Sequence, residues 1–103
     1  MDDSIPELYT TENIPLGRKI IHQRYQIREI GFYWLIAELD KNKNLAFGYA
    51  NLNDDQFAEW GYISIEELSE NRAELDKDWR PCTYQEAREH IRQERGEQHQ
   101  QRG

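Results

Sequence analysis

Alternating apolar and polar positions along the middle of the chain predict a series of β-strands. Residues 19–27 have one apolar and one polar face, which is typical of an antiparallel strand with one solvated side. Residues 32–39 are apolar on both faces at their start, so we expect this strand in the centre of the sheet. The polar run 40–44 predicts a hairpin, and residues 45–50 and 60–63 predict two further strands.

Two helix starts follow the last predicted strand. Ser64 and Glu67 have the spacing of a capping box, in which each side chain bonds a backbone N–H of the first turn. Thr83 and Glu86 repeat this spacing, and the helix that they begin is expected to stop near Gly96. The order of these elements, strands first and helices afterwards, predicts an α+β fold.

A chain of 103 residues has room for one domain. We expect an irregular lead-in at residues 1–18, one α+β domain at residues 19–95 and a disordered polar tail at residues 96–103. Within the domain, we expect a four-stranded antiparallel β-meander over residues 19–63, with two helices packed on one face of it.

The charge of the chain limits the choice of partners. The net charge is −7, and residues 50–78 hold nine acids against Arg72 and Lys77. Such a chain repels nucleic-acid backbones and anionic membranes on average and attracts basic proteins. No apolar run approaches the roughly 18 residues of a membrane span, and the only cysteine, Cys82, allows no intrachain disulfide. We therefore expect a cytoplasmic protein, and a monomer.

Four stretches, in order and spacing, carry a resemblance to a known family. They read IPELYTTEN, YWLIAELD, LAFGYA and GYISIEEL. The chain resembles a family of small bacterial proteins that is frequent on plasmids and other mobile elements and is catalogued as a domain of unknown function. The matching positions are Leu8, Tyr9, Glu12, Trp34, Glu38, Asp40, Gly61, Tyr62, Ser64, Glu67 and Leu68. Leu39 replaces an aromatic residue of the family pattern. The resemblance covers roughly residues 5–83 and implies a compact α+β domain, with no established activity to carry over.

Possible catalytic and metal-binding groups each have a simpler structural interpretation. Glu38 and Asp40 share a face of the central strand. A buried pair of carboxylates at this place could act in acid–base catalysis. The simpler interpretation is that the strand ends here in a polar hairpin, which leaves both carboxylates solvated. His90 and Glu94 have a metal-ligand spacing that also arises by chance on a charged helix. Cys82 has no histidine near it in sequence. We therefore predict a protein that is not an enzyme and that holds no metal and no cofactor.

Two functions remain open. In the first, an acidic surface over residues 54–78 binds a basic protein partner, with the acids standing in for nucleic-acid phosphates. The candidate residues are Asp54, Asp55, Glu59, Glu70, Glu74, Asp76 and Asp78. In the second, the protein is a nucleic-acid accessory that uses the sheet aromatics and the bases of the first strand. These bases are Arg18, Lys19, Arg24 and Arg28.

Overall fold

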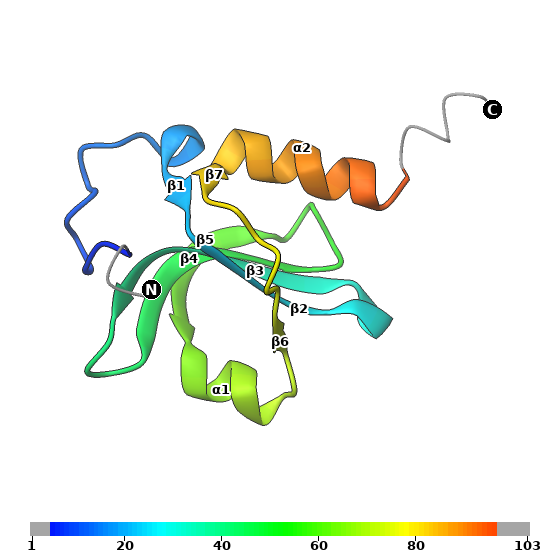
Figure 1. Cartoon of the computed structure of the whole chain (residues 1–103), viewed down its shortest axis with the longest axis horizontal. Coiled ribbons are helices and arrows are strands. Elements are labelled where there is room, and N and C mark those ends of the chain that lie inside the picture. Colours follow the sequence, from blue (N-terminus) through cyan, green and yellow to red (C-terminus); the bar gives the residue numbers. More distant parts are fainter. Residues whose placement is uncertain (1–4, 97–103) are drawn as a thin grey trace.

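The computed structural model describes residues 5–96 and has the predicted α+β fold, built on one five-stranded antiparallel sheet (Figure 1). The strand order is β5-β4-β3-β2-β6. The strands are β2 (Gln23–Ile27), β3 (Phe32–Asp40), β4 (Leu45–Leu52), β5 (Glu59–Ser64) and β6 (Glu74–Leu75). The first four form the predicted meander, and β6 pairs with the outer edge of β2 as a fifth strand that the sequence pattern did not reveal.

A second, two-stranded sheet and two helices complete the fold. The short strands are β1 (Ile20–Ile21) and β7 (Cys82–Thr83), and the helices are α1 (Ile65–Glu70) and α2 (Tyr84–Glu94). Two 3-10 turns, η2 (Leu16–Arg18) and η3 (Arg28–Ile30), flank β1 and β2. The predicted first strand is therefore divided at His22, because its first residues pair with β7 rather than with β3. Of the expected polar tail, only Gly96 lies within the described residues.

The two helices cover opposite faces of the main sheet, and not one face as the sequence pattern suggested (Figure 1). Ala87 and Ile91 of α2 pack with Leu35 on one face, while Leu68 of α1 packs with Ile36 on the other. Leu35 and Ile36 are adjacent in β3, and both are fully buried. A strand with large apolar residues on both faces needs a covering layer on each side, which explains the arrangement.

An irregularity in the pairing of β3 with β4 changes the direction of one functional side chain. Ile36 pairs with Gly48, but Glu38 pairs with Phe47, so β3 carries one extra residue between them. A Cβ atom at Gly48 would lie 1.9 Å from the carbonyl oxygen of Leu35, so only glycine fits this close approach. The bulge places Glu38 on the α2 face of the sheet, opposite to the face of Ile36.

Both predicted helix starts are present. Ser64 Oγ accepts a hydrogen bond from the backbone N–H of Glu67 at 3.1 Å, which is one half of the expected box. Thr83 and Glu86 form both halves, at 3.1 and 2.9 Å, and Gly96 follows α2 with a φ of +71°. Within residues 5–96, no helix has the length and apolar character that crossing a membrane requires.

Candidate functional site

Glu38 fixes the lead-in to the central strand. Its carboxylate is buried, and Oε1 accepts a hydrogen bond from the backbone N–H of Tyr9 at 2.8 Å. Oε2 accepts one from the backbone N–H of Thr11 at 3.0 Å and another from the Thr11 hydroxyl. The expectation that Glu38 stays solvated is therefore wrong. Asp40, by contrast, accepts hydrogen bonds from the N–H groups of the hairpin that follows it, as expected for a turn.

Lys19 approaches the same threonine from the other side. Its ammonium group donates to the backbone oxygen of Thr11 and, at 2.7 Å, to the Thr11 hydroxyl oxygen. Lys19 is only 4% exposed and Glu38 only 3%. Two buried opposite charges thus share Thr11 as a bridging group, and their hydrogen bonds offset much of the cost of removing them from water.

A pocket of about 380 Å³ opens above these two charges. The lead-in and the ends of β3, β4 and β5 line it with Tyr9, Glu12, Ile14, Pro15, Leu16, Lys19, Glu38, Phe47 and Tyr62. Tyr9 and Tyr62 form its rim and are 60% and 56% exposed. The Tyr62 hydroxyl donates to the Tyr9 hydroxyl at 3.0 Å, and this bond raises the pKa of Tyr62, with smaller effects from the charges of Glu38 and Glu12. We call this the tyrosine pocket.

The tyrosine pocket is the exposed end of a row of aromatic rings along the α2 face of the sheet. Each ring in this row has its centroid within 6.4 Å of the next. The order is Tyr33, Tyr49, Tyr84, Trp60, Phe47, Tyr62 and Tyr9. Tyr33 and Tyr49 of this row are buried in the core, whereas Tyr62 is exposed.

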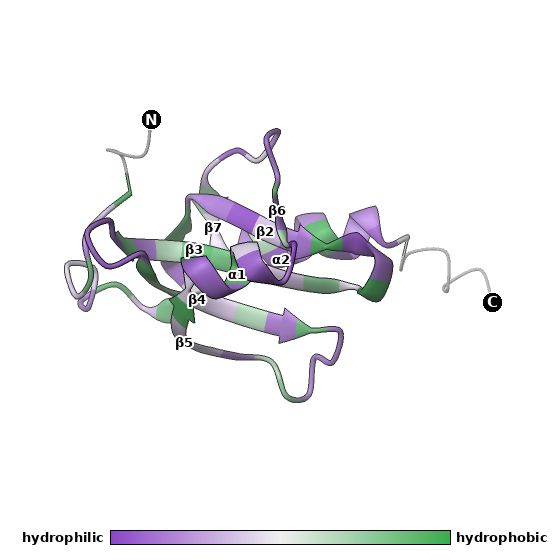
Figure 2. Cartoon of the chain, turned by 90° about the horizontal axis from the view of Figure 1, so that it is seen from below, coloured by the Kyte–Doolittle hydropathy of each residue, from purple (hydrophilic) through white to green (hydrophobic). Residues whose placement is uncertain are grey.

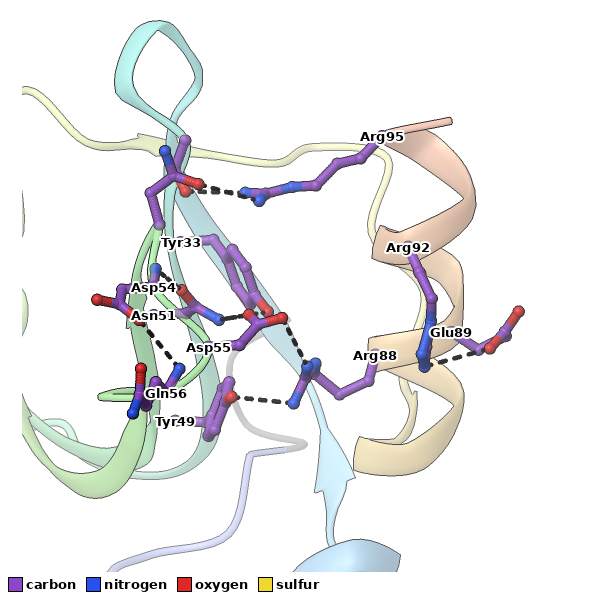
Figure 3. Close-up of polar contacts among 12 residues, drawn as sticks. Tyr33, Tyr49, Asn51, Asp54, Asp55, Gln56, Arg88, Glu89, Arg92 and Arg95 are labelled. Atoms are coloured by element: carbon purple, nitrogen blue, oxygen red, sulfur yellow. Dashed lines mark hydrogen bonds and ion pairs between the residues drawn. The ribbon is translucent and has the colours of Figure 1, made fainter. Parts of the chain in front are cut away.

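Arg88 of α2 and Arg95, which caps its C-terminus, cover the other end of this row (Figure 3). The Arg88 guanidinium lies 5.2 Å from the ring centre of Tyr49 and donates to the hydroxyls of Tyr49 and Tyr84 at 2.9 and 2.8 Å. Arg95 lies 5.3 Å from the ring centre of Tyr33. These contacts combine cation–π attraction with hydrogen bonds and hold α2 against the sheet.

The fully buried Asn51 orders the loop between β4 and β5 beside these arginines (Figure 3). Its amide group donates to the Tyr33 hydroxyl at 3.1 Å and to Asp55 at 2.7 Å, and its oxygen accepts the backbone N–H of Asp54. Asp55 lies 3.8 Å from Arg88. Asp54 and Asp55, two of the predicted partner-binding acids, therefore take part in internal contacts.

The predicted acidic surface over residues 54–78 is divided between the two edges of the sheet. Asp54, Asp55 and Glu59 lie on or before β5, whereas Glu70, Glu74, Asp76 and Asp78 lie on α1, on β6 and just after it. Strands β5 and β6 are the two outer strands, four strand spacings or about 19 Å apart. The seven acids therefore do not meet in one patch.

Two bases of the predicted first strand are buried and do not form an exposed basic edge. Lys19 is buried as described, and Arg24, 4% exposed, forms ion pairs with Asp76 at 2.6 Å and with Glu94 at 2.7 Å. The Arg24 guanidinium lowers the pKa of Glu94. Arg18 and Arg28 remain exposed.

The other candidate groups show no catalytic arrangement among residues 5–96. His90 Nε2 lies 3.1 Å from Glu94 Oε2, within the network that holds Arg24. No group of three or more histidine, cysteine or acidic side chains in this part of the chain is placed to hold a metal ion. Burial, and secondarily Glu86, raises the pKa of Cys82, which disfavours the reactive thiolate.

The positions that carry the family resemblance separate into two groups. Tyr9, Glu12, Glu38 and Tyr62 come from three separate stretches of sequence and meet in the tyrosine pocket. Four of the others support the fold: Ser64 caps α1, Asp40 shapes the hairpin, and Trp34 of β3 packs against the cluster that contains Leu68 of α1. Thr11 and Lys19 were not predicted for this site, because their role depends on the bulge that re-directs Glu38.

Comparison with protein-family models, curated proteins and solved structures gives no match to this chain.

Proposed function

We propose that this protein is a small non-enzymatic interaction protein that binds a basic protein partner. The binding surface that we infer is formed by the exposed acids on and after α1. We call it the α1 acidic surface and define it as Glu66, Glu67, Glu70 and Glu74. It is smaller than the acidic stretch of the sequence, because Asp54, Asp55 and Glu59 lie before β5 or at its first residue, whereas α1 follows its last residue.

The observation that carries this proposal is a cluster of exposed carboxylates without an ion-pair partner among the described residues. Lys19 and Arg24 are turned inward and are held by internal partners, whereas the four carboxylates of the α1 acidic surface are exposed. Among residues 5–96, no ion pair joins these four carboxylates to a base. Figure 2 views the molecule from the α1 side and shows hydrophilic positions on this helix.

Clustered carboxylates of this kind favour fast, salt-sensitive association with a basic surface. Helix capping accounts for only part of the cluster. Glu66 and Glu67 lie in the first turn of α1, where negative charge is stabilising, but Glu70 ends the helix and Glu74 follows it. A basic partner offers the exposed carboxylates the ion pairs that they lack among residues 5–96.

The nucleic-acid alternative has less support, since Lys19 and Arg24 of the predicted basic edge are engaged within the protein. Arg28 remains exposed, so a duplex and single-strand binding assay separates the two functions. Under the proposed function, neither nucleic acid binds appreciably at physiological salt. Binding that Arg28→Ala abolishes would favour the alternative.

The proposed function is tested by capture of host proteins on the untagged full chain at low and at high salt. The test variant carries Glu66→Gln, Glu70→Gln and Glu74→Gln. A matched control carries Glu29→Gln, Glu59→Gln and Glu89→Gln, three exposed acids on other elements. We expect wild type and control to capture the same basic protein at low salt and to release it at high salt, and the test variant to lose it. Equal capture by the test variant would contradict the proposal.

A further inference from the structure

The tyrosine pocket combines exposed aromatic rings, an acid and apolar walls near the end of β5, on the face of the sheet opposite to α1. Tyr62 lies two residues before Ser64, the cap of α1. We propose that this pocket binds an arginine side chain of the basic partner, with the guanidinium against the rings of Tyr9 and Tyr62 and bonded to Glu12. This inference rests on the proposed function and assigns a specific role to the pocket within it.

The first argument is the use of the same aromatic row elsewhere in the molecule. Arg88 lies over Tyr49 and, at 5.8 Å, over Tyr84, and Arg95 lies over Tyr33 (Figure 3). At the other end of the row, the residues lining the tyrosine pocket include no arginine. The row thus continues past the part that α2 covers, and its last two rings are exposed to solvent.

The second argument is the charge of the pocket. Lys19 and Glu38 at its base have opposite charges and are both bonded to Thr11, so they largely satisfy each other within the protein. Glu12 is the remaining charged group of the lining, and it is exposed, with no ion pair to a described residue. The pocket therefore has one negative charge to offer beside two exposed tyrosine rings, which suits a cation and disfavours an anion.

The third argument distinguishes arginine from other cationic side chains. The guanidinium is planar, stacks on aromatic faces and donates two parallel hydrogen bonds to a carboxylate, whereas the lysine ammonium is a compact and strongly hydrated charge. Ile14, Pro15 and Leu16 form the apolar wall along which the methylene stem of an arginine can lie. An arginine is thus complemented by the pocket along its whole length.

The test is an NMR titration of the full chain with the blocked tripeptide acetyl-Ala-Arg-Ala-amide, against acetyl-Ala-Gln-Ala-amide and acetyl-Ala-Lys-Ala-amide. We expect saturable shifts at Tyr9, Glu12 and Tyr62 with the arginine peptide, weaker binding of the lysine peptide and none of the glutamine peptide. Tyr62→Ala and Glu12→Gln should each lower the affinity for the arginine peptide by about ten-fold. Phe57→Ala, which removes an aromatic side chain that is 75% exposed outside the pocket, should leave binding unchanged.

The variant with Glu66→Gln, Glu70→Gln and Glu74→Gln separates this inference from the proposed function. It should keep the affinity for the arginine peptide while losing the protein partner. If the arginine peptide instead binds wild type and Tyr62→Ala equally, the inference is overturned, whether or not the partner is captured. It is also overturned if sedimentation shows a dimer that Tyr62→Ala dissociates, since a second copy of the chain would then occupy the pocket.

Discussion

Thr11 and Glu38, 27 residues apart in the sequence, are joined by two hydrogen bonds to a single carboxylate oxygen. This contact and the bond from Tyr9 attach the irregular lead-in to the central strand. The lead-in thereby becomes one wall of the tyrosine pocket. The integrity of the pocket therefore depends on Glu38.

Glu38→Ala should lower the free energy of unfolding by about 3 kcal/mol, because it leaves the buried Lys19 ammonium without its opposite charge. Urea unfolding followed by circular dichroism measures this change. Glu12→Ala, at an exposed position of the same pocket, is the control and should change stability by less than about 0.5 kcal/mol. Equal losses in the two variants would show that Glu38 does not hold the lead-in.

Two glycines of neighbouring strands should respond differently to alanine. At Gly48, the added methyl group collides with the backbone oxygen of Leu35. Gly48→Ala should therefore lower the free energy of unfolding by roughly 3 kcal/mol. At Gly61, an added Cβ has no other atom within 4 Å, so Gly61→Ala should be tolerated. Thermal unfolding of both variants compares them directly. A tolerated Gly48→Ala would mean that β3 and β4 are not paired through this bulge.

Ser64→Ala should lower the free energy of unfolding by about 0.5–2 kcal/mol, because the backbone N–H of Glu67 loses the hydroxyl that caps α1. The fold should not change, since Leu68 still anchors the helix to the sheet. Urea midpoints give the loss, and coincident midpoints of mutant and wild type would speak against a capped helix start.

Stability should fall at acidic pH partly through Glu94. Its folded-state pKa is lowered from the ordinary value of 4.5 by the hydrogen bond from Arg24. A carboxylate with a lowered pKa stabilises the fold above its unfolded-state pKa, and this contribution is lost as the pH falls through the folded-state pKa. Glu94→Gln should therefore flatten the dependence of the urea midpoint on pH below about 4.5. An unchanged pH profile would contradict this role of Glu94.

The sequence predicts the parts of the fold that local patterns determine. The meander follows from alternation within each strand, and the helix starts follow from the spacing of Ser64 with Glu67 and Thr83 with Glu86. The two-sided helix cover was not predicted, although residues 32–39 are apolar on both faces and such a strand needs a layer on each side. Strand β6 was missed, since a two-residue strand has too little alternation to recognise.

The tyrosine pocket could be predicted only in part. The resemblance identified Tyr9, Glu12, Glu38 and Tyr62, but strict alternation along the stretch YWLIAELD places Glu38 on the same face as Ile36. The bulge between these two residues reverses that direction, and a single inserted position leaves no mark in the hydrophobic pattern. The aromatic row likewise depends on contacts between strands and α2 that lie far apart in the sequence.

The central claim, a basic protein partner on the α1 acidic surface, is tested most directly by photo-crosslinking in the host cell. A photoreactive benzoylphenylalanine at position 69 replaces the exposed, uncharged Ser69 of α1 and leaves the four acids intact. The same residue at position 57, in place of the exposed Phe57, reports a surface outside α1. The account predicts a protein adduct at position 69, absent at position 57, whose cross-linked peptide is rich in arginine and lysine. A nucleic-acid adduct, or the same adducts at both positions, would contradict it.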